Sequence, residues 1–475
     1  MTSSSLPQTA SGRRLSEVLR LIRTATPETV CAFVKEHYTE ENAKREKPEK
    51  RIATFMDWRT RGGFEVLEIL ESREDYLVVQ ARQPYTDEYW RLALRTGEGS
   101  AQPIAALLLG RSPMPVIENP GSDEDTARNV LAYAARLAVA DLFSGAVLVG
   151  RHGKILGQAA FGYANRDFDI ENRIDTRFNV ASLTKSWTAV AIAQLAEAGI
   201  LSLQDPVSKF VDYPDRKTAQ STRVEHLLSH TSGLGDYFVP EFARRSRCDM
   251  RSVDDYLELC KSYTATFAAG ANWKYSNVGM VLLGKIIEVV TGKDYFEHVK
   301  VSVLEKAGMS QSGFPELDFV NKDTAVGYHK VWSLEGPRYY NSLFEGAVRG
   351  SPAGCGYATV EDVFRFAEAF KADKLVGRQM RLLMTSPKPE LGSPDYGFGF
   401  AIHPQSVLYG HSGGLIGASS NLDITAEPGG WVIVVLCNDL SMRSLVLKAR
   451  QLIGVTVPEA EEGRAYLPHT GLSAR

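Results

Sequence analysis

The first hundred residues show two kinds of hydrophobic pattern. From Leu15 to about Ala43, apolar residues recur with helical spacing, and Pro27 is placed to start a second helix. Four short strand-like stretches then follow, and turn-forming residues separate them, as expected for strands. These stretches are Phe64–Leu70, Tyr76–Ala81, Tyr89–Leu94 and Ile104–Leu109. Helices followed by an antiparallel meander predict a small α+β domain.

A proline-rich segment separates this region from the rest of the chain. Its prolines forbid helix and interrupt sheet pairing, so we expect a linker at 113–122, between domains at 1–112 and 123–475. The second domain opens with a helical pattern over 123–141 and two strand patterns over 144–149 and 155–162. A long helical middle follows, and strand patterns return after Tyr396. We therefore expect one antiparallel sheet, built from both ends of this domain and flanked by helices, with an all-helical subdomain inserted.

Composition and charge narrow the functional classes. A formal net charge of -3 provides no basic field, so we expect no nucleic-acid partner. The five cysteines include no C-x-x-C pair, which argues against a zinc site and a disulfide framework and favours a reducing compartment. The first twenty residues lack an apolar signal segment, and no stretch is long enough to span a bilayer. We expect a cytoplasmic protein.

The segment that begins at Ser182 carries the first candidate chemistry. Ser182-Leu-Thr-Lys185 opens an apolar, alanine-rich pattern that predicts a buried helix. Residues three apart share a helix face, so Lys185 should lie one turn above the Ser182 hydroxyl. A serine hydroxyl needs a neighbouring base, and a lysine can be that base if burial lowers its pKa. The same four-residue pattern also arises by chance in a chain of this length.

Tyr275-Ser-Asn277 is the second candidate, just before another apolar helix. A phenol close to a lysine can relay protons, and an asparagine amide can orient the lysine or hold a substrate carbonyl. The spacing also occurs at Tyr163–Asn165 and Tyr339–Asn341. A loop leading into a buried helix is the firmer platform, which favours Tyr275 as the catalytic tyrosine.

The glycine-rich segment around His411 is the third candidate. Glycines at Gly413 and Gly414 allow a backbone to approach a ligand closely, and an N–H near Gly414 could join that of Ser182 in an oxyanion hole. An alternative is the nucleophile elbow G-x-S-x-G of α/β-hydrolases, since Gly410–Gly414 matches it. In that alternative the later Asp423, Asp439 and His469 would supply the acid and the base.

The ordered set of three motifs resembles the serine β-lactamase and penicillin-binding-protein superfamily. The likeness is to the class C β-lactamase-like branch, which includes D-alanyl-D-alanine carboxypeptidases, D-aminopeptidases and family VIII carboxylesterases. It extends from about Asp123 to about Asp439 and includes the segments FSGAVLVGRHGKILGQAAFGYANRD, HLLSHTSGLGDYF and SPAGCGYATVEDVFRFAEAF.

The resemblance implies an α/β sandwich that performs acyl transfer with no metal or organic cofactor. It assigns nucleophilic attack to Ser182, proton transfers to Lys185 and Tyr275, substrate contact to Asn277, and the far wall of the site to His411.

His411 stands where β-lactamases of this branch usually have a lysine, so we expect weaker binding of a substrate carboxylate. An esterase or a peptidase/amidase acting on a small molecule or short peptide is the leading hypothesis. An acyltransferase, a weak β-lactamase and a catalytically silent binding protein remain alternatives. The role of the N-terminal domain and any oligomeric state stay open.

Overall fold

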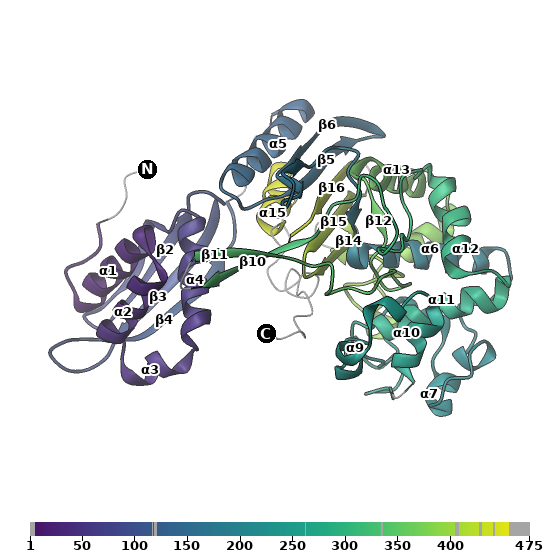
Figure 1. Ribbon diagram of the computed structural model, residues 1–475, viewed down its shortest axis with the longest axis horizontal. Coiled ribbons are helices and arrows are strands. Elements are labelled where there is room, and N and C mark those ends of the chain that lie inside the picture. The colour runs from purple at the N-terminus through teal and green to yellow at the C-terminus, as the bar shows by residue number, and fades with distance from the viewer. Residues whose placement is uncertain are drawn as a thin grey trace.

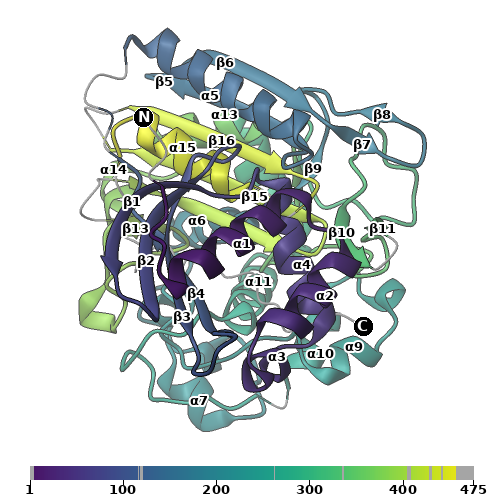
Figure 2. The ribbon, with the colours of Figure 1, turned by 90° about the vertical axis from the view of Figure 1, so that its left-hand side faces the viewer.

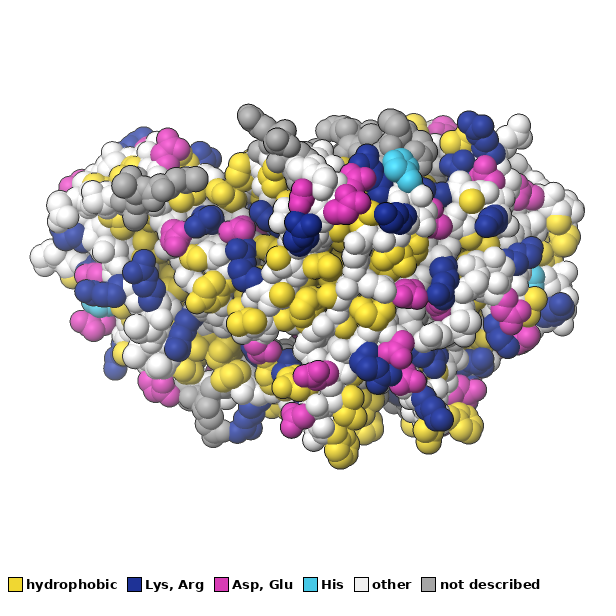
Figure 3. Space-filling model, turned by 90° about the horizontal axis from the view of Figure 1, so that it is seen from above, with side chains coloured by type: hydrophobic (Ala, Val, Ile, Leu, Met, Phe, Trp, Pro, Cys, Tyr) yellow, Lys and Arg dark blue, Asp and Glu magenta, His cyan; other side chains and the backbone are white. Residues whose placement is uncertain are grey.

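The computed structural model describes residues 5–115, 117, 121–261, 263–333, 336–403, 408–426, 430–439 and 442–455. Figure 1 shows an N-terminal part (residues 5–112) beside a larger C-terminal part (residues 121–455). Within these described stretches, no helix is long and apolar enough to cross a membrane. On the face seen in Figure 3, basic and acidic side chains lie interspersed rather than gathered by sign.

The N-terminal part packs four helices against one antiparallel sheet (Figure 2), of which the sequence pattern predicted the sheet and the first two helices. The helices are α1 (Ala10–Thr24), α2 (Pro27–His37), α3 (Glu40–Arg45) and α4 (Pro48–Thr60). The strands lie in chain order, as β1 (Glu65–Ser72), β2 (Tyr76–Gln83), β3 (Glu88–Thr96) and β4 (Ile104–Ser112). Pro27 does begin α2, where Thr26 caps the helix. The pattern did not predict α4.

The C-terminal part is centred on a six-stranded antiparallel sheet in the order β13-β14-β15-β16-β5-β6. Its strands are β5 (Gly145–Arg151), β6 (Lys154–Phe161), β13 (Ala401–His403), β14 (Leu408–Leu415), β15 (Ala418–Thr425) and β16 (Trp431–Cys437). The late strand β16 pairs with the early strand β5. This confirms the expected sheet built from both ends of the second domain.

Helices cover both faces of this sheet because successive strand residues point to opposite sides. On one face, Val147 and Ile433 pack in a cluster with α5 (Asp123–Val139) and α15 (Arg443–Leu452). On the other face, Leu148 and Val434 pack in a cluster with α6 (Thr184–Glu197) and α13 (Val360–Lys371). Figure 1 shows the two pairs of helices on opposite sides of the strands.

The middle of the chain forms the predicted helical region. Its helices are α7 (Arg216–Ser221), α8 (Val224–Leu228), α9 (Pro240–Arg244), α10 (Val253–Cys260), α11 (Asn277–Thr291) and α12 (Tyr295–Val299), with α14 (Arg378–Met384) later in the chain. Short strands also occur, namely β7 (Tyr163–Asn165), β8 (Ile170–Glu171), β9 (Phe178–Asn179) and β12 (Tyr357–Ala358). Single turns lie at Ala181–Leu183, Val207–Lys209, Arg247–Asp249, Lys300–Glu305 and Pro389–Leu391.

One hairpin contradicts the expectation that strands return only after Tyr396. Strands β10 (Tyr328–Ser333) and β11 (Gly336–Asn341) pair with each other and form an arm that reaches the N-terminal part (Figure 1). At the arm, Trp332 packs against the N-terminal core. A pattern of alternating residues marks a strand only where one face is buried locally, whereas this hairpin is covered by a distant part of the chain.

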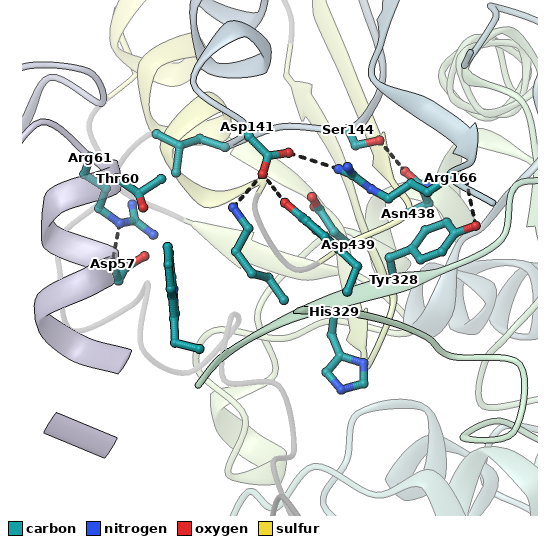
Figure 4. A pocket seen from close by; sticks show the side chains of 14 residues that line it. Asp57, Thr60, Arg61, Asp141, Ser144, Arg166, Tyr328, His329, Asn438 and Asp439 are labelled. Carbon is teal, nitrogen blue, oxygen red and sulfur yellow. Dashed lines mark hydrogen bonds and ion pairs between the residues drawn. The ribbon is translucent and has the colours of Figure 1, made fainter. Parts of the chain in front are cut away.

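The base of the arm is held by one carboxylate of the C-terminal part. Asp141 accepts hydrogen bonds from Lys330 (2.5 Å), Arg166 (3.0 Å) and the hydroxyl of Tyr339. These side chains line a cavity of about 230 Å³ between the two parts, and Figure 4 shows Asp141 at the centre of its polar contacts. The pKa of Asp141 is lowered because these hydrogen bonds outweigh its partial burial, which acts in the opposite direction.

A second contact joins the two parts through the start of β3. The Glu88 side chain is only 4% exposed and lies 3.6 Å from Arg61 and 3.2 Å from Arg111. The Ser444 hydroxyl of α15 donates to the same carboxylate at 2.5 Å. The adjacent Asp87 forms ion pairs with Arg136 of α5 (2.6 Å) and Lys448 of α15 (3.7 Å).

Candidate active site

The structure places Ser182 and Lys185 together, where α6 begins. Ser182 lies in a tight turn (Ala181–Leu183) directly before the helix rather than in its first turn. The Lys185 Nζ donates to the Ser182 Oγ at 3.0 Å, as the spacing of three residues predicted. Ala181 has a left-handed backbone (φ +45°), and its N–H is held by the Asn179 side chain at 2.8 Å. A strained, hydrogen-bonded residue thus fixes the direction of the adjacent serine.

Lys185 is fully buried, and its surroundings explain its acid–base state. Burial lowers the pKa of its amine from 10.5 to about 7, while the charges of Asp236 and Cys355 act in the opposite direction. The amine also donates to the carbonyl of Ala353. About half of the Lys185 side chains are therefore neutral at pH 7, and a neutral amine can accept the proton of Ser182.

Tyr275 lies beside the same two residues. The Lys185 Nζ is 4.7 Å from the centre of the Tyr275 ring. Burial raises the pKa of the Tyr275 phenol, and a hydrogen bond with the Ser182 side chain lowers it by less. The phenol is thus protonated at neutral pH and suited to pass a proton on. Of the two alternative tyrosines, Tyr163 lies in β7, and Tyr339 lies in the arm, where its hydroxyl contacts Asp141.

Asn277 is close to this group but contacts a residue that the sequence did not suggest. It is the first residue of α11, and its Nδ2 donates to Asp236 Oδ2 at 2.9 Å. The field of the Asp236 carboxylate acts on both Lys185 and Tyr275. Asp236 follows Gly235 in a loop. An aspartate next to a glycine is common in turns and does not by itself indicate a functional residue. No local signal distinguished it.

His411 lies in β14 and contacts a tyrosine that the sequence did not suggest. The His411 Nε2 is 2.9 Å from the Tyr396 hydroxyl, and Nδ1 is 2.6 Å from the carbonyl of Ser412. Burial, with a smaller effect of Lys185, lowers the pKa of His411 to about 3. The imidazole is therefore neutral, and since a carbonyl can only accept, Nδ1 carries the proton and Nε2 accepts from Tyr396.

Gly413 is required by close contact between β14 and the serine turn. A Cβ added there would lie 2.6 Å from both Ser182 N and Val180 O. Only glycine lets the strand pass so close to Ser182. Gly414 is the next residue of β14 and pairs with Ser419. Its role as an oxyanion donor stays a prediction.

The nucleophile-elbow alternative is wrong for Gly410–Gly414. Ser412 lies inside strand β14, whereas the elbow requires a sharp turn from a strand into a helix. Asp423 is bound by Arg450 at 2.7 and 2.8 Å, so it serves an ion pair within the fold. His469 lies outside the described residues.

A model of the beta-lactamase family matches residues 132–456, more than half of the chain. The protein belongs to the beta-lactamase family. This confirms the resemblance seen in the three motifs. The family match begins within α5, so the N-terminal sheet lies outside it.

Individual relatives in this family have different names. Penicillin-binding protein 4* of Bacillus subtilis is 30% identical over 298 residues, which cover 58% of this chain but only 64% of that protein, less than two thirds of its length. Esterase EstB of Burkholderia gladioli is 30% identical over 298 residues, covering 54% of this chain and 74% of the esterase. A solved penicillin-binding protein from Bacillus halodurans superimposes with a TM-score of 0.58 at 30% identity, covering 64% of this chain and 93% of its own.

Proposed function

We propose that this beta-lactamase family member is a serine hydrolase that forms an acyl-enzyme on Ser182. Its substrate is a small ester or amide, which includes short peptides. The observation that carries the proposal is the 3.0 Å contact between the Ser182 Oγ and a buried Lys185 whose pKa is about 7. A serine paired with an amine that is about half neutral at pH 7 is an activated nucleophile.

The mechanism follows from the protonation states of the site. Neutral Lys185 takes the proton of Ser182 as the oxygen attacks the substrate carbonyl, and the N–H groups of Ser182 and Gly414 stabilise the oxyanion. The proton then passes through the Tyr275 phenol to the leaving group, and the bond from the carbonyl carbon to the leaving group breaks. Water repeats these steps and releases the acid. The raised pKa of Tyr275 favours Lys185 as the principal base.

The neutral His411 favours an esterase or amidase over an efficient β-lactamase. An uncharged imidazole offers a substrate carboxylate less attraction than an ammonium would. The 30% identity to esterase EstB supports ester hydrolysis. An acyltransferase would use the same acyl-enzyme with an alcohol or amine in place of water. Against a silent binding protein stands the intact group of Ser182, Lys185 and Tyr275.

The first test is the mass of the intact protein after exposure to a fluorophosphonate and to p-nitrophenyl butyrate. Wild type should gain one adduct, Ser182→Ala none, and Ser412→Ala, a matched control on β14, as much as wild type. Labelling of Ser182→Ala would overturn the assignment of the nucleophile. A folded wild-type protein that gains no adduct and releases no p-nitrophenol would favour the silent binding protein.

Two further assignments belong to the same proposal. Residues 1–112 form a domain joined through 113–122 to the hydrolase domain at 123–475, which the separate hydrophobic clusters of the two parts support. The protein is cytoplasmic, in line with its five free thiols at Cys31, Cys248, Cys260, Cys355 and Cys437. Limited proteolysis within 113–122 and cell fractionation test these assignments.

A further inference from the structure

A second cavity, of about 170 Å³, adjoins the segment that holds Ser182. Its wall includes Asn179, Cys355 and Leu415. We call it the acyl cavity, for the reasons that follow. It is separate from the 230 Å³ cavity beside the arm, although Asn438 lines both.

Three contacts tie the acyl cavity to the nucleophile. The Asn179 side chain accepts from the N–H of Ala181, the residue before Ser182. The N–H of Cys355 donates to the Ala181 carbonyl at 3.1 Å. Leu415 ends the strand in which Gly413 packs against Ser182 N. Part of the cavity wall therefore comes from the backbone segments that position the serine.

The lining of the acyl cavity is uncharged. Among the described residues that line it there is no Lys, Arg, Asp, Glu or His. Apolar side chains such as Leu317, Phe319 and Leu343 alternate with neutral polar ones such as Asn179 and Ser342. An ionised group placed here would lose its hydration without a charged partner, whereas an uncharged group would not.

Apolar side chains continue outward from the lining. Phe319 is 69% exposed and Leu343 is 50% exposed, although both line the cavity. Their sequence neighbours Val320 and Phe344 are 94% and 86% exposed. Large apolar side chains rarely gather at the surface without a function, and here they adjoin a cavity next to the nucleophile.

The position of the proton-transfer groups indicates which part of a substrate enters. The ring of His230 contacts the rings of both Tyr275 and Tyr396, and Tyr396 is hydrogen-bonded to His411. Neither Tyr275, Tyr396 nor His411 lines the acyl cavity. A leaving group must depart beside the residue that protonates it, which is Tyr275. The cavity is left for the group on the other side of the scissile carbonyl, the acyl group.

We propose that this cavity binds the acyl group of the substrate, and that this group is uncharged and largely apolar. The proposal rests on the proposed function, since it assumes an acyl-enzyme on Ser182. It further identifies Gly346 as a position that sets the permitted length. Gly346 lines the cavity, and a Cβ added there meets nothing within 4 Å, so a larger side chain enters open space without a clash at its base.

The charge and polarity of the preferred acyl group are tested by measuring wild-type kcat/KM for p-nitrophenyl acetate, butyrate and hemisuccinate. Each buried methylene should raise kcat/KM about fourfold, so butyrate should exceed acetate about sixteenfold. Hemisuccinate differs from butyrate by a carboxylate in place of the terminal methyl, and it should be at least tenfold slower than butyrate. Leu343→Arg should raise kcat/KM for hemisuccinate at least tenfold relative to that for butyrate, because the guanidinium gives the substrate carboxylate a charged partner.

Gly346→Phe tests the length. Its ratio of butyrate to acetate kcat/KM should fall at least tenfold toward unity, because the ring occupies the space of the longer chain. Gly110→Phe is the matched control, since a Cβ at Gly110 on β4 of the N-terminal sheet also meets nothing within 4 Å. The control should keep the wild-type ratio.

The failures of the two proposals are distinguishable. If wild type hydrolyses acetate in a Ser182-dependent way but accepts hemisuccinate as well as butyrate, the acyl cavity is wrongly assigned and the hydrolase stands. An unchanged ratio in Gly346→Phe has the same meaning. If wild type neither hydrolyses acetate nor gains a Ser182 adduct, the proposed function fails, and the acyl cavity fails with it.

Discussion

The protonation of Lys185 makes a sharp prediction about pH. Its pKa of about 7 lies well below the usual 10.5, and one pKa unit corresponds to about 1.36 kcal/mol. The net effect of the surroundings, led by burial, therefore disfavours the ammonium by about 5 kcal/mol. In the proposed mechanism the neutral amine is the active base, so kcat/KM for p-nitrophenyl butyrate should rise with pH through 7. The neutral fraction is about a tenth at pH 6 and about nine tenths at pH 8.

The perturbation that isolates this effect is Lys185→Arg. A guanidinium stays charged at every pH in the range, so the variant should lose about 10²- to 10⁴-fold in kcat/KM, the usual contribution of a general base. The assay is the initial rate of p-nitrophenol release from pH 5.5 to 9, with the rate of fluorophosphonate labelling as a second readout. A wild-type profile that is flat between pH 6 and 8, or a variant that keeps a tenth of the activity, would refute the role of Lys185.

Three further predictions concern stability and packing. Lys185→Met should remove a pH dependence of the free energy of unfolding, because above pH 7 the wild type binds fewer protons when folded than when unfolded. Between pH 7 and 9.5 the unfolding free energy of the wild type, measured with urea, should therefore rise by about 3 kcal/mol relative to the variant. Parallel pH curves for the two proteins would contradict this. Gly413→Ala should lower kcat/KM at least about 100-fold, because its Cβ meets Ser182 N, and near-normal activity in a folded variant would exclude that clash. Glu88→Gln should cost about 1–3 kcal/mol of unfolding free energy, whereas the exposed Glu71→Gln should cost under about 1 kcal/mol; equal losses would contradict the buried role of Glu88.

The sequence predicted those features whose cause is local. The contact of Ser182 with Lys185 follows from a spacing of three residues at a helix start. The four strands of the N-terminal sheet, and β5 and β6 of the central sheet, follow from strand-like stretches with turns between them. Strand β16 is an uninterrupted apolar run because both of its faces are buried. Spacing alone left three tyrosines open, and the apolar helix that follows Tyr275 favoured it over Tyr163 and Tyr339.

The features that the sequence did not suggest depend on distant parts of the chain. Asp236 and Tyr396 reach the site from loops, and only the folded chain brings them to Asn277 and His411. The arm of β10 and β11 lacks a local core, since Trp332 packs on residues more than two hundred positions earlier. A hydrophobic period reports the burial of its own segment and cannot identify such partners.

The contacts of the N-terminal part also determine when the protein can finish folding during its synthesis. Its own sheet and helices lie within residues 10–112, yet Glu88 is covered by Ser444 of α15, the last described helix. The central sheet also needs a late segment of the chain, because the early strand β5 pairs with the late strand β16. Domains generally fold in order as the ribosome releases them. Here the surface around Glu88 and the edge of β5 remain uncovered until almost the whole chain has emerged. During that interval both are accessible to chaperones.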